Sequence, residues 1–591
     1  MASSPPGACG AQSPSRVLVG LTDAQRRAVE VDDAPLCVLA GAGSGKTTVL
    51  TRRVARRALD GTLRAEHALV VTFTRKAAGE LRDRLARLGV PGGVRAGTFH
   101  AVALAQLRTY WADHGTRPLA LVDDPTRLVR AVLGPGGAGP GEVAAVVAEV
   151  HWAQVRMLRP EEFSAAALAT DRGAPPGMTH GDVAEVFARY QGEKQRRGVL
   201  DLDDLITRAA AVLEDDPVAA AAQRWRTRHL FVDEFQDVNP AQWRLLRAWL
   251  GEGRDLFVVG DPRQAIYSWN GADPSLLDRL PSLVPGTTVV RLDDNHRSTP
   301  QVVSAATAVL GAEVAQASRP DGPRPVVEGF DDDDAEAAAL ARWLRRAHRP
   351  GRRWSHLAVL ARTNTRLEPV ARALARAGIP HRHANDAAAA ARQRRALADL
   401  RRMRGDRSLR SALAEVVVEV AARAPEDAPG VGGPPPTLLR LADEHAAEYP
   451  DGTVGEFLEW LAAGADEELG LDRADGVELS TFHRAKGLEW PAVAVVGLED
   501  GMVPIAYATT PDAVAEERRL LYVALTRAED DLWCSWAATR RSGDRTWRTQ
   551  ASPLLSAVEE AVAVAGPTPS ADPRQIAARV AALRARLPDV G

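Results

Sequence analysis

The stretch that most constrains the fold of this chain is LCVLAGAGSGKTT, residues 36–48. An apolar run, long enough for one buried strand, leads into a loop of small residues, and Lys46 and Thr47 then open a helix. Such a loop lets backbone N–H groups converge on a phosphate, and the helix N-terminus adds partial positive charge. The pattern is typical of a P-loop, in its relaxed form because Ala40 replaces the first glycine. It predicts that Lys46 reaches the β- and γ-phosphates of ATP and that Thr47 ligates Mg²⁺. The predicted nucleotide-binding loop comprises Ala40, Gly41, Ala42, Gly43, Ser44, Gly45, Lys46, Thr47 and Thr48.

Composition limits the remaining possibilities. The 591 residues suffice for about three or four domains of about 150 residues each. Nucleic-acid binders are often basic overall, so the net charge of −3 argues mildly against one, but it does not exclude a locally basic channel. The three cysteines, Cys9, Cys37 and Cys534, are odd in number and far apart, which favours reduced thiols in a cytoplasmic protein. Residues 1–16 are rich in Ser, Pro and Gly and predict a disordered N-terminus rather than a signal peptide, and no run is long enough to span a membrane.

A second apolar run, residues 68–74, predicts the next strand, so that strand, helix and strand form a unit of a parallel sheet. Ligands gather at the carboxyl ends of such strands. Phe73 and Thr74 occupy one such end, followed by two basic residues, and this combination suits a single-stranded backbone with one base stacked on the ring. His100, after Gly97-Thr98-Phe99, repeats this chemistry at the next strand end. For Phe73 and Phe99, packing in the core is an equally good explanation.

Acidic and amide side chains follow two further apolar runs. Asp233 and Glu234 come directly after the run 230–232, where a P-loop protein holds Mg²⁺ and activates the attacking water. We assign Asp233 to the metal and Glu234 to the base. Gln264, just after the run 256–260, lies close enough in sequence to sense a γ-phosphate. Tyr267 and Trp269 are predicted to flank successive bases, unless they belong to a strand that buries both on one face.

The second half of the chain contains another α/β unit. It begins near Val289 and includes the segment His296-Arg297, a strand near residues 358–360, and His483 and Glu489 after the apolar run 477–481. Arg527 follows the predicted helix that contains residues 517–526. An arginine supplied by a lobe other than the one with the P-loop can act as an arginine finger in phosphoryl transfer.

Taken together, these segments resemble the motif series of the UvrD/Rep/PcrA-type superfamily 1 DNA helicases. The matching segments, in order, are AGAGSGKTT, VTFTRKAAGELRDRL, GTFHA, DEFQD, VVGDPRQAIYSWNGA, NHRS, TFHRAKGLEW and EERRLLYVALTRAED. The resemblance implies an α/β fold of two RecA-like P-loop NTPase lobes with parallel sheets, each lobe carrying an inserted, mainly helical subdomain. It also implies ATP and Mg²⁺ in the cleft between the lobes, and 3′→5′ movement on single-stranded and tailed duplex DNA. Such a role lies in DNA repair or replication, with repair proteins as partners.

The resemblance also implies roles for single residues. Gln25, which alone reads as a surface glutamine, would recognise adenine, and Gln264 would sense the γ-phosphate. Arg297 and Arg527 would be arginine fingers, and His296 and Glu489 would contact the nucleotide. The DNA contacts implied are Phe73, Thr74, His100, Tyr267, Trp269 and His483.

The motif positions predict domain boundaries. We expect a disordered N-terminus at 1–16, a first lobe at 17–103 and 206–288 with a helical insert at 104–205, a second lobe at 289–383 and 476–565 with a shortened helical insert at 384–475, and a C-terminal tail at 566–591.

Three departures from the family pattern favour translocation over strong unwinding. His296 replaces the tyrosine that usually stacks on adenine, and Asn270 replaces a basic residue common before Gly271. The second insert is short, and Gly430-Val431-Gly432 is only a faint match to the family's duplex-contacting segment. The alternatives are therefore a helicase, a translocase that strips proteins from single strands, and an inactive DNA-binding scaffold. The scaffold would require the loss of Lys46, Glu234, Arg297 or Arg527, and all four are present.

Overall fold

The computed structural model describes residues 14–383, apart from 91, 123–124, 135–138 and 312–314, and residues 475–564, apart from 543–544. Between them it describes part of 384–474, chiefly residues 452–462. The chain forms two compact units. Unit 1 comprises residues 1–293 and 384–474, and unit 2 comprises residues 294–383 and 475–591.

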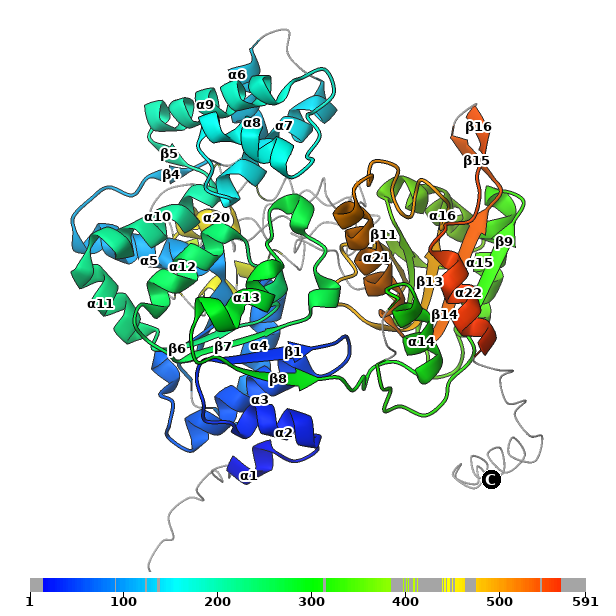
Figure 1. The fold of residues 1–591 in the computed structure, drawn as a ribbon, viewed down its shortest axis with the longest axis horizontal. Helices are drawn as coiled ribbons and strands as arrows, with labels where there is room; N and C mark the ends of the chain where they lie inside the picture. The colour runs from blue at the N-terminus through cyan, green and yellow to red at the C-terminus, as the bar shows by residue number, and fades with distance from the viewer. Residues whose placement is uncertain are drawn as a thin grey trace, which may run out of the picture. The chain divides into compact units, whose positions relative to one another are not determined.

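Unit 1 is built on a six-stranded sheet in the order β3-β2-β6-β7-β1-β8, in which every pairing is parallel (Figure 1). The four central strands are almost wholly buried apolar runs, as expected for strands covered on both faces. The strands are β1 (Leu36–Ala40), β2 (Ala68–Thr72), β3 (Arg95–Thr98), β6 (His229–Val232), β7 (Leu256–Gly260) and β8 (Thr288–Leu292).

Alternate residues of these strands enter two separate cores. One face, with Val38, Val70 and Phe231, packs on α2 (Asp23–Glu30), α3 (Lys46–Leu59) and α4 (Arg75–Arg87). The other face, with Val71 and Val232, packs on α5 (Phe99–Asp113), α10 (Leu202–Asp215), α12 (Pro240–Leu250) and α13 (Ser275–Leu283). Because every pairing in this sheet is parallel, the carboxyl ends of its strands lie at one edge, where the P-loop begins.

A helical subdomain is inserted in unit 1. It has its own core, from Leu128 to Tyr190, and appears in cyan in Figure 1. Its helices are α6 (Pro125–Leu133), α7 (Pro140–Val155), α8 (Pro160–Ala169) and α9 (His180–Arg197), and the short parallel pair β4 (Ala120–Leu121) and β5 (Val199–Leu200) lies between them and the lobe in sequence.

Unit 2 contains a second six-stranded sheet in the order β11-β12-β10-β13-β14-β9, again parallel throughout. Its strands are β9 (Val326–Phe330), β10 (Leu357–Ala361), β11 (His381–His383), β12 (Val477–Thr481), β13 (Trp490–Val496) and β14 (Ala528–Ala537). One face packs on α15 (Asp333–Ala347) and α16 (Asn364–Arg376). The other helices of the unit are α14 (Pro300–Ala308), α21 (Pro511–Leu525) and α22 (Leu555–Val564), and an antiparallel hairpin is formed by β15 (Thr539–Ser542) and β16 (Arg545–Arg548). The α/β class and the two parallel RecA-like sheets agree with the prediction from the motifs.

Two segments belong to a different unit from the one that the predicted domain boundaries assign to them. The strand β8, near the expected start of the second lobe, pairs with β1 and completes the first sheet. The described helix of the second insert, α20 (Val454–Ala462), belongs to unit 1. There Arg75 places its guanidinium 4.2 Å from the centre of the Trp460 ring and donates to the carbonyl of Leu461 at 2.7 Å.

Some predictions fall outside the described residues: the Gly430-Val431-Gly432 segment, the tail at 566–591, and residues 1–13 of the predicted disordered N-terminus. Residues 14–17 form a short helix, α1 (Pro14–Val17). Cys37 and Cys534 are buried free thiols, and burial raises the pKa of each to about 12. Within the described ranges, no helix has both the length and the apolar character needed to cross a bilayer.

Candidate nucleotide and nucleic-acid site

The P-loop follows β1 at the carboxyl edge of the first sheet. Gly45 precedes helix α3 in the left-handed region, with φ of +87°, and a Cβ there would lie 2.7 Å from Gln25 Nε2. Only glycine therefore fits at this position without displacing Gln25. Ser44 folds the loop on itself, because its hydroxyl donates to the carbonyl of Gly41 at 2.8 Å. Lys46 Nζ donates to the carbonyls of Ala40 and Gly41 at 3.2 and 3.4 Å, which places the ammonium within the loop that it is predicted to serve.

Gln25 is not the surface glutamine that its local sequence suggests. It is 6% exposed, and its Nε2 donates to the carbonyl of Ser44 at 2.9 Å. Its Oε1 accepts from the N–H of Thr22, which closes a capping box at the start of α2. The side chain thus joins the first turn of α2 to the P-loop.

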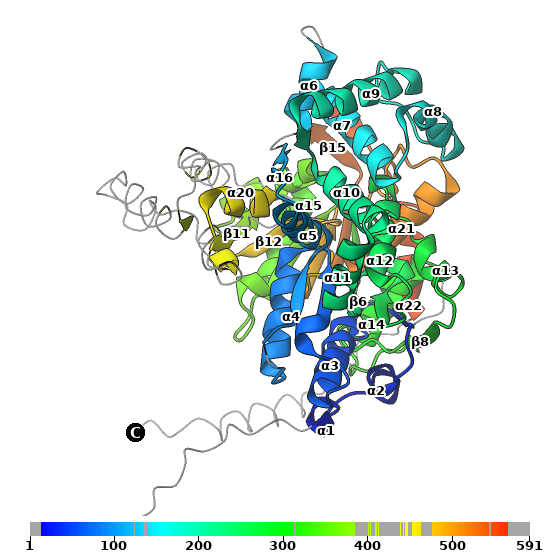
Figure 2. The same ribbon diagram turned by 90° about the vertical axis from the view of Figure 1, so that its left-hand side faces the viewer.

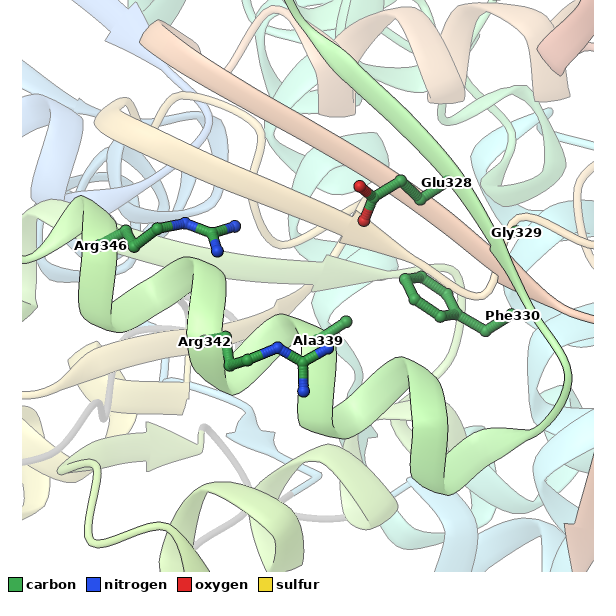
Figure 3. A pocket seen from close by; sticks show the side chains of 6 residues that line it. All are labelled: Glu328, Gly329, Phe330, Ala339, Arg342 and Arg346. Atoms are coloured by element: carbon green, nitrogen blue, oxygen red, sulfur yellow. The ribbon is translucent and has the colours of Figure 1, made fainter.

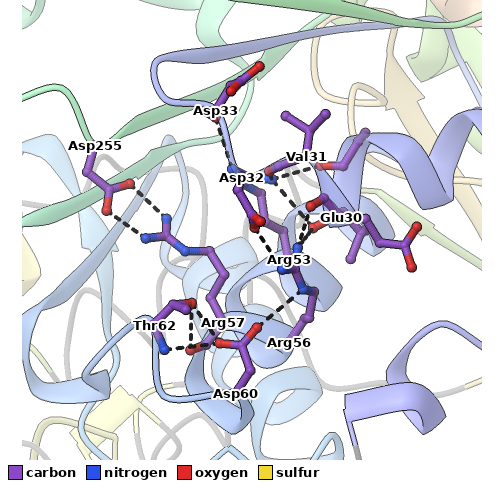
Figure 4. Close-up of polar contacts among 12 residues, drawn as sticks. Glu30, Val31, Asp32, Asp33, Arg53, Arg56, Arg57, Asp60, Thr62 and Asp255 are labelled. Atoms are coloured by element: carbon purple, nitrogen blue, oxygen red, sulfur yellow. Dashed lines mark hydrogen bonds and ion pairs between the residues drawn. The ribbon is translucent and has the colours of Figure 1, made fainter.

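The other end of α2 is held by arginines of α3, the same helix that Lys46 opens (Figure 4). Arg53 is 1% exposed and donates to the carbonyls of Ala28, Val31 and Asp33, at 3.2, 2.5 and 3.4 Å. Burial lowers the pKa of Arg53 to about 10. Arg56 donates to the carbonyl of Glu30 at 2.6 Å, whereas Arg57 turns away to form a bidentate pair with Asp255 at 2.8 Å. The carbonyl end of a helix attracts cations, so these arginines fix α2 against the P-loop helix.

The predicted metal and base residues follow β6. Asp233 is 5% exposed, and Glu234 takes the left-handed conformation, with φ of +51°, which is strained for a residue other than glycine. Gln236 Nε2 donates to Glu234 at 2.5 Å, and Gln236 Oε1 accepts from the N–H of Asp261 at 2.9 Å. Gln264 Nε2 in turn donates to Asp261 Oδ2 at 2.7 Å. The predicted base and the predicted γ-phosphate sensor are therefore linked through Gln236 and Asp261.

The Asp233 carboxyl fits a divalent cation. Burial and then the neighbouring Glu234 charge raise its pKa to about 7, against the opposing effect of Lys46. A cation at this point would favour the ionised carboxylate, and the Thr47 hydroxyl at the start of α3 would supply a second oxygen ligand. Mg²⁺ held by these residues would neutralise phosphate charge. Among the described residues, no cluster of three or more Asp, Glu, His or Cys forms a ready-made metal cage, as expected where phosphates and water complete the coordination of the cation.

The predicted DNA contacts of unit 1 follow the carboxyl ends of β2, β3 and β7. Phe73 is half-buried against the core, with its ring 5.9 Å from that of the buried Phe99, and Thr74 caps α4 by accepting from the N–H of Ala77 at 3.1 Å. His100 is half-buried, and burial lowers its pKa. Tyr267 and Trp269 lie at a 3₁₀ turn rather than in a strand, and Trp269 is 51% exposed. About half of the Trp269 side chain is therefore open to solvent.

In unit 2 the predicted finger residues converge from three distant segments. Arg297 and Glu489 form an ion pair, with Nε 2.6 Å from Oε2. Arg297 also approaches the carbonyl of Thr526 at 3.4 Å, and Arg527 donates to the carbonyl of Leu488 at 3.0 Å. Arg527 is 1% exposed, and its guanidinium also donates to the carbonyl of Val523 at 2.9 Å.

The two histidines assigned in unit 2 differ in their surroundings. His296, which directly precedes Arg297 in the chain, places its Nδ1 2.7 Å from the hydroxyl of Ser318. His483 follows β12 at the carboxyl edge of the second sheet, and burial followed by the Arg362 charge lowers its pKa to about 4. His483 is therefore neutral at physiological pH and would contact DNA by hydrogen bonding or stacking rather than by charge.

A hollow of about 400 Å³ in unit 2 lies between β9 and α15 (Figure 3). It is lined by Glu328, Gly329, Phe330, Ala339, Arg342 and Arg346. None of the predicted site residues lines it, so it is separate from the nucleotide and DNA assignments.

Sequence reasoning missed Gln236, Asp261 and Arg53. Asp261 directly follows a buried apolar strand, as Asp233 does. This shared position could have marked Asp261 as a candidate site residue from the sequence. Arg53 offered no signal, because a buried arginine in an amphipathic helix looks the same in sequence as a surface one.

Two parallel sheets, one ending in a P-loop and the other carrying a paired arginine and glutamate, define the class of two-lobed P-loop NTPases. A family model described as the UvrD/REP helicase N-terminal domain matches residues 21–285, and one described as the UvrD-like helicase C-terminal domain matches residues 290–394 and 437–539. The chain belongs to the UvrD/Rep family of ATP-dependent DNA helicases.

Individual relatives agree with this assignment. ATP-dependent DNA helicase UvrD2 of Mycobacterium tuberculosis is 37% identical over 576 residues, which cover 90% of this chain and 81% of the relative. ATP-dependent DNA helicase UvrD1 of Mycobacterium bovis is 30% identical, over 91% of this chain and 84% of its own length. ATP-dependent DNA helicase PcrA of Bacillus subtilis is 26% identical, over 90% of this chain and 85% of its own length.

Proposed function

We propose that this protein couples ATP hydrolysis to 3′→5′ movement on single-stranded DNA and to the unwinding of tailed duplexes, in DNA repair or replication. One observation carries the proposal: the sheet order β3-β2-β6-β7-β1 places predicted DNA contacts and nucleotide residues along one carboxyl edge. Phe73 and His100 follow β2 and β3, and Asp233, Gln264 and the P-loop follow β6, β7 and β1. DNA and nucleotide would thus bind to adjacent strands of one rigid sheet.

The hydrolytic step follows from the residues at this edge. Glu234 accepts a proton from a water molecule while the oxygen of that water attacks the γ-phosphorus. The bond between the γ-phosphorus and the bridging β-phosphate oxygen breaks, which releases ADP and phosphate. Lys46 stabilises the charge on the β- and γ-phosphates. Thr47 and Asp233 would hold Mg²⁺, which would add positive charge beside the phosphates when bound. Gln25 recognises the adenine edge, with His296 and Glu489 as further nucleotide contacts.

Arg297 and Arg527 supply the remaining positive charge as arginine fingers. They belong to unit 2, whereas the P-loop belongs to unit 1. We therefore propose that turnover requires both units. Trp269, Tyr267, Phe73, Thr74, His100 and His483 would contact the strand on which the protein moves.

A second candidate is a translocase that displaces proteins from single strands and unwinds poorly without a partner, such as a repair protein. The short second insert favours it, because less protein is available to engage a duplex. The predicted cytoplasmic location is compatible with either function.

One preparation and two substrates test these proposals. We would measure ATP hydrolysis with single-stranded DNA, and strand separation on a duplex with a 3′ tail and on one with a 5′ tail. Stimulated hydrolysis with separation of only the 3′-tailed duplex supports the helicase. Stimulated hydrolysis without separation supports the translocase, and hydrolysis that DNA does not stimulate contradicts both.

A further inference from the structure

A cluster of basic and aromatic residues lies at the opposite edge of the first sheet from the nucleotide site. The amino ends of β3, β2 and β6 are neighbours there, and three segments meet beside them. These are η1 (Ala65–His67), the start of β3, and the end of α11 (Pro217–Arg226), which is labelled in Figure 1. We define the basic patch as Arg64, His67, Arg95, Trp225, Arg226 and Arg228.

Trp225 is the centre of the basic patch. It is 59% exposed at the end of α11, although tryptophan usually contributes to stability by burial. Its ring is held by two neighbours: His67 contacts it edge-on at 4.3 Å between ring centres, and Arg228 lies over it at 5.6 Å. An indole held in place but open to solvent loses little conformational freedom when a planar group stacks on it.

The three segments that meet here also carry four arginines without acidic partners. Arg64, Arg95, Arg226 and Arg228 are exposed, and none of them forms an ion pair within the part of the chain that the structure describes. The Glu66 carboxylate acts in the opposite direction on the pKa of His67. One carboxylate does not balance four arginines, so the basic patch keeps a net positive charge. Asp255, near the start of β7, is already paired with Arg57 and His229.

Several of these like charges lie close enough to affect one another. Arg95 Nη2 donates to the backbone carbonyl of Arg226 at 2.6 Å, which holds the Arg95 guanidinium beside that segment. Burial, and then the Arg226 charge, lower the pKa of Arg95, and burial followed by the Arg228 charge lowers that of His67. The buried His67 Nδ1 also has no hydrogen-bond partner in the described structure. Concentrating positive charge in this way costs stability unless an anion offsets it.

We propose that the basic patch is a second binding surface for single-stranded DNA, separate from the carboxyl edge on which the motor residues lie. Trp225 would stack on one base, and the arginines would contact the flanking phosphates, a combination that suits single strands without sequence preference. The proposal rests on the proposed DNA-dependent function, because it assigns this surface to the same strand on which the protein moves. A strand long enough to reach both edges of the lobe would bind more tightly than a short one.

The test uses fluorescein-labelled oligothymidylates of increasing length, titrated without ATP. Wild-type protein should bind a long strand at least fivefold more tightly than one that fills only the motor site. Trp225→Ala, and the pair Arg226→Glu with Arg228→Glu, should remove this gain and leave short-strand binding unchanged. The salt dependence of long-strand binding should fall by about 1.4 in log–log slope for the double reversal, at ~0.7 for each lost phosphate contact. Trp225→Phe should retain most of the gain, since it keeps an aromatic face.

Matched controls separate the basic patch from general effects. Val218→Ala removes an exposed apolar group from the same helix, and Arg87→Glu reverses an exposed charge elsewhere on unit 1. Neither should change the length dependence. The double reversal should also raise the midpoint of thermal unfolding slightly, because it relieves like-charge repulsion, whereas loss of a merely structural contact would lower it.

Three outcomes would overturn the proposal. Wild type could bind long and short strands equally, or the Trp225 variant could keep the full gain. A glutamate-rich peptide could bind wild type and lose binding in the variants while long-strand binding is unchanged, which would assign the basic patch to an acidic protein. Failure of the short strand to bind wild type would instead contradict the proposed function, so the two failures are distinguishable.

Discussion

Arg297 and Glu489, which lie far apart in sequence, form an ion pair at 2.6 Å in unit 2. Glu489 is about half exposed, whereas the arginine side chain is 19% exposed. The guanidinium thus reaches the surface where a carboxylate neutralises its charge. A triphosphate competes well for such an arginine, because it offers more negative charge in a geometry that guanidinium matches. If Arg297 is the proposed arginine finger, this ion pair would hold it in place before nucleotide binds.

Arg297→Ala should lower kcat for ATP hydrolysis about a thousandfold with saturating single-stranded DNA, because an arginine finger acts chiefly in the transition state. KM should change much less. Steady-state ATPase assays measure both. Arg349→Ala, an exposed arginine of the same unit, is the matched control and should behave as wild type. An unchanged kcat in Arg297→Ala would remove it from the catalytic residues.

Glu234→Gln should abolish turnover while leaving nucleotide binding intact. General-base catalysis contributes about 10²–10⁴-fold, and the isosteric amide keeps the hydrogen-bonding position of the side chain beside Gln236. Fluorescent-ATP titration and single-turnover hydrolysis separate binding from chemistry. A variant that binds ATP weakly but hydrolyses what it binds at the wild-type rate would show that Glu234 is a binding residue.

Asp233→Asn should lose Mg²⁺-dependent hydrolysis and yet stabilise the nucleotide-free protein. The Asp233 pKa of about 7 in the folded state exceeds its ordinary value of 3.8, so the folded state holds a proton that the unfolded state releases. The free energy of unfolding of the wild type therefore falls as pH rises from about 4 to about 7. The Asn side chain of the variant does not titrate, so the variant avoids this loss. Thermal unfolding midpoints should show a gain for the variant that grows over this range and then levels off. A gain that is constant from pH 4 to pH 8 would contradict the raised pKa.

Arg53→Met should raise KM for ATP severalfold with little change in kcat, and should weaken discrimination between ATP and GTP. The reason is that Arg53 fixes the carbonyl end of α2, whose first turn carries Gln25. Arg57→Met is the matched control, since it lies on the same helix but pairs with Asp255. Arg53→Lys should restore part of the discrimination. Equal effects of the Arg53 and Arg57 variants on nucleotide choice would indicate general destabilisation of α3.

The sequence by itself determined the family and the class of fold. A P-loop is a contiguous pattern, because phosphate binding requires neighbouring N–H groups, and buried parallel strands are contiguous apolar runs. Gly45 and Lys46 could therefore be assigned without the structure. The family could also be identified without the structure, because each motif is a short contiguous segment of the sequence.

Tertiary structure decided whatever depends on which strands are neighbours. Gln25 reads as a surface residue until α2 packs on α3 and buries it at Ser44. Asp261 gains a role only when β7 lies next to β6 and Gln236 connects the two strand ends. The basic patch, likewise, exists only because the order β3-β2-β6 brings Arg95 to Arg226. Burial and charge act through space over a few ångströms, so they depend on the order of the strands rather than on distance along the chain.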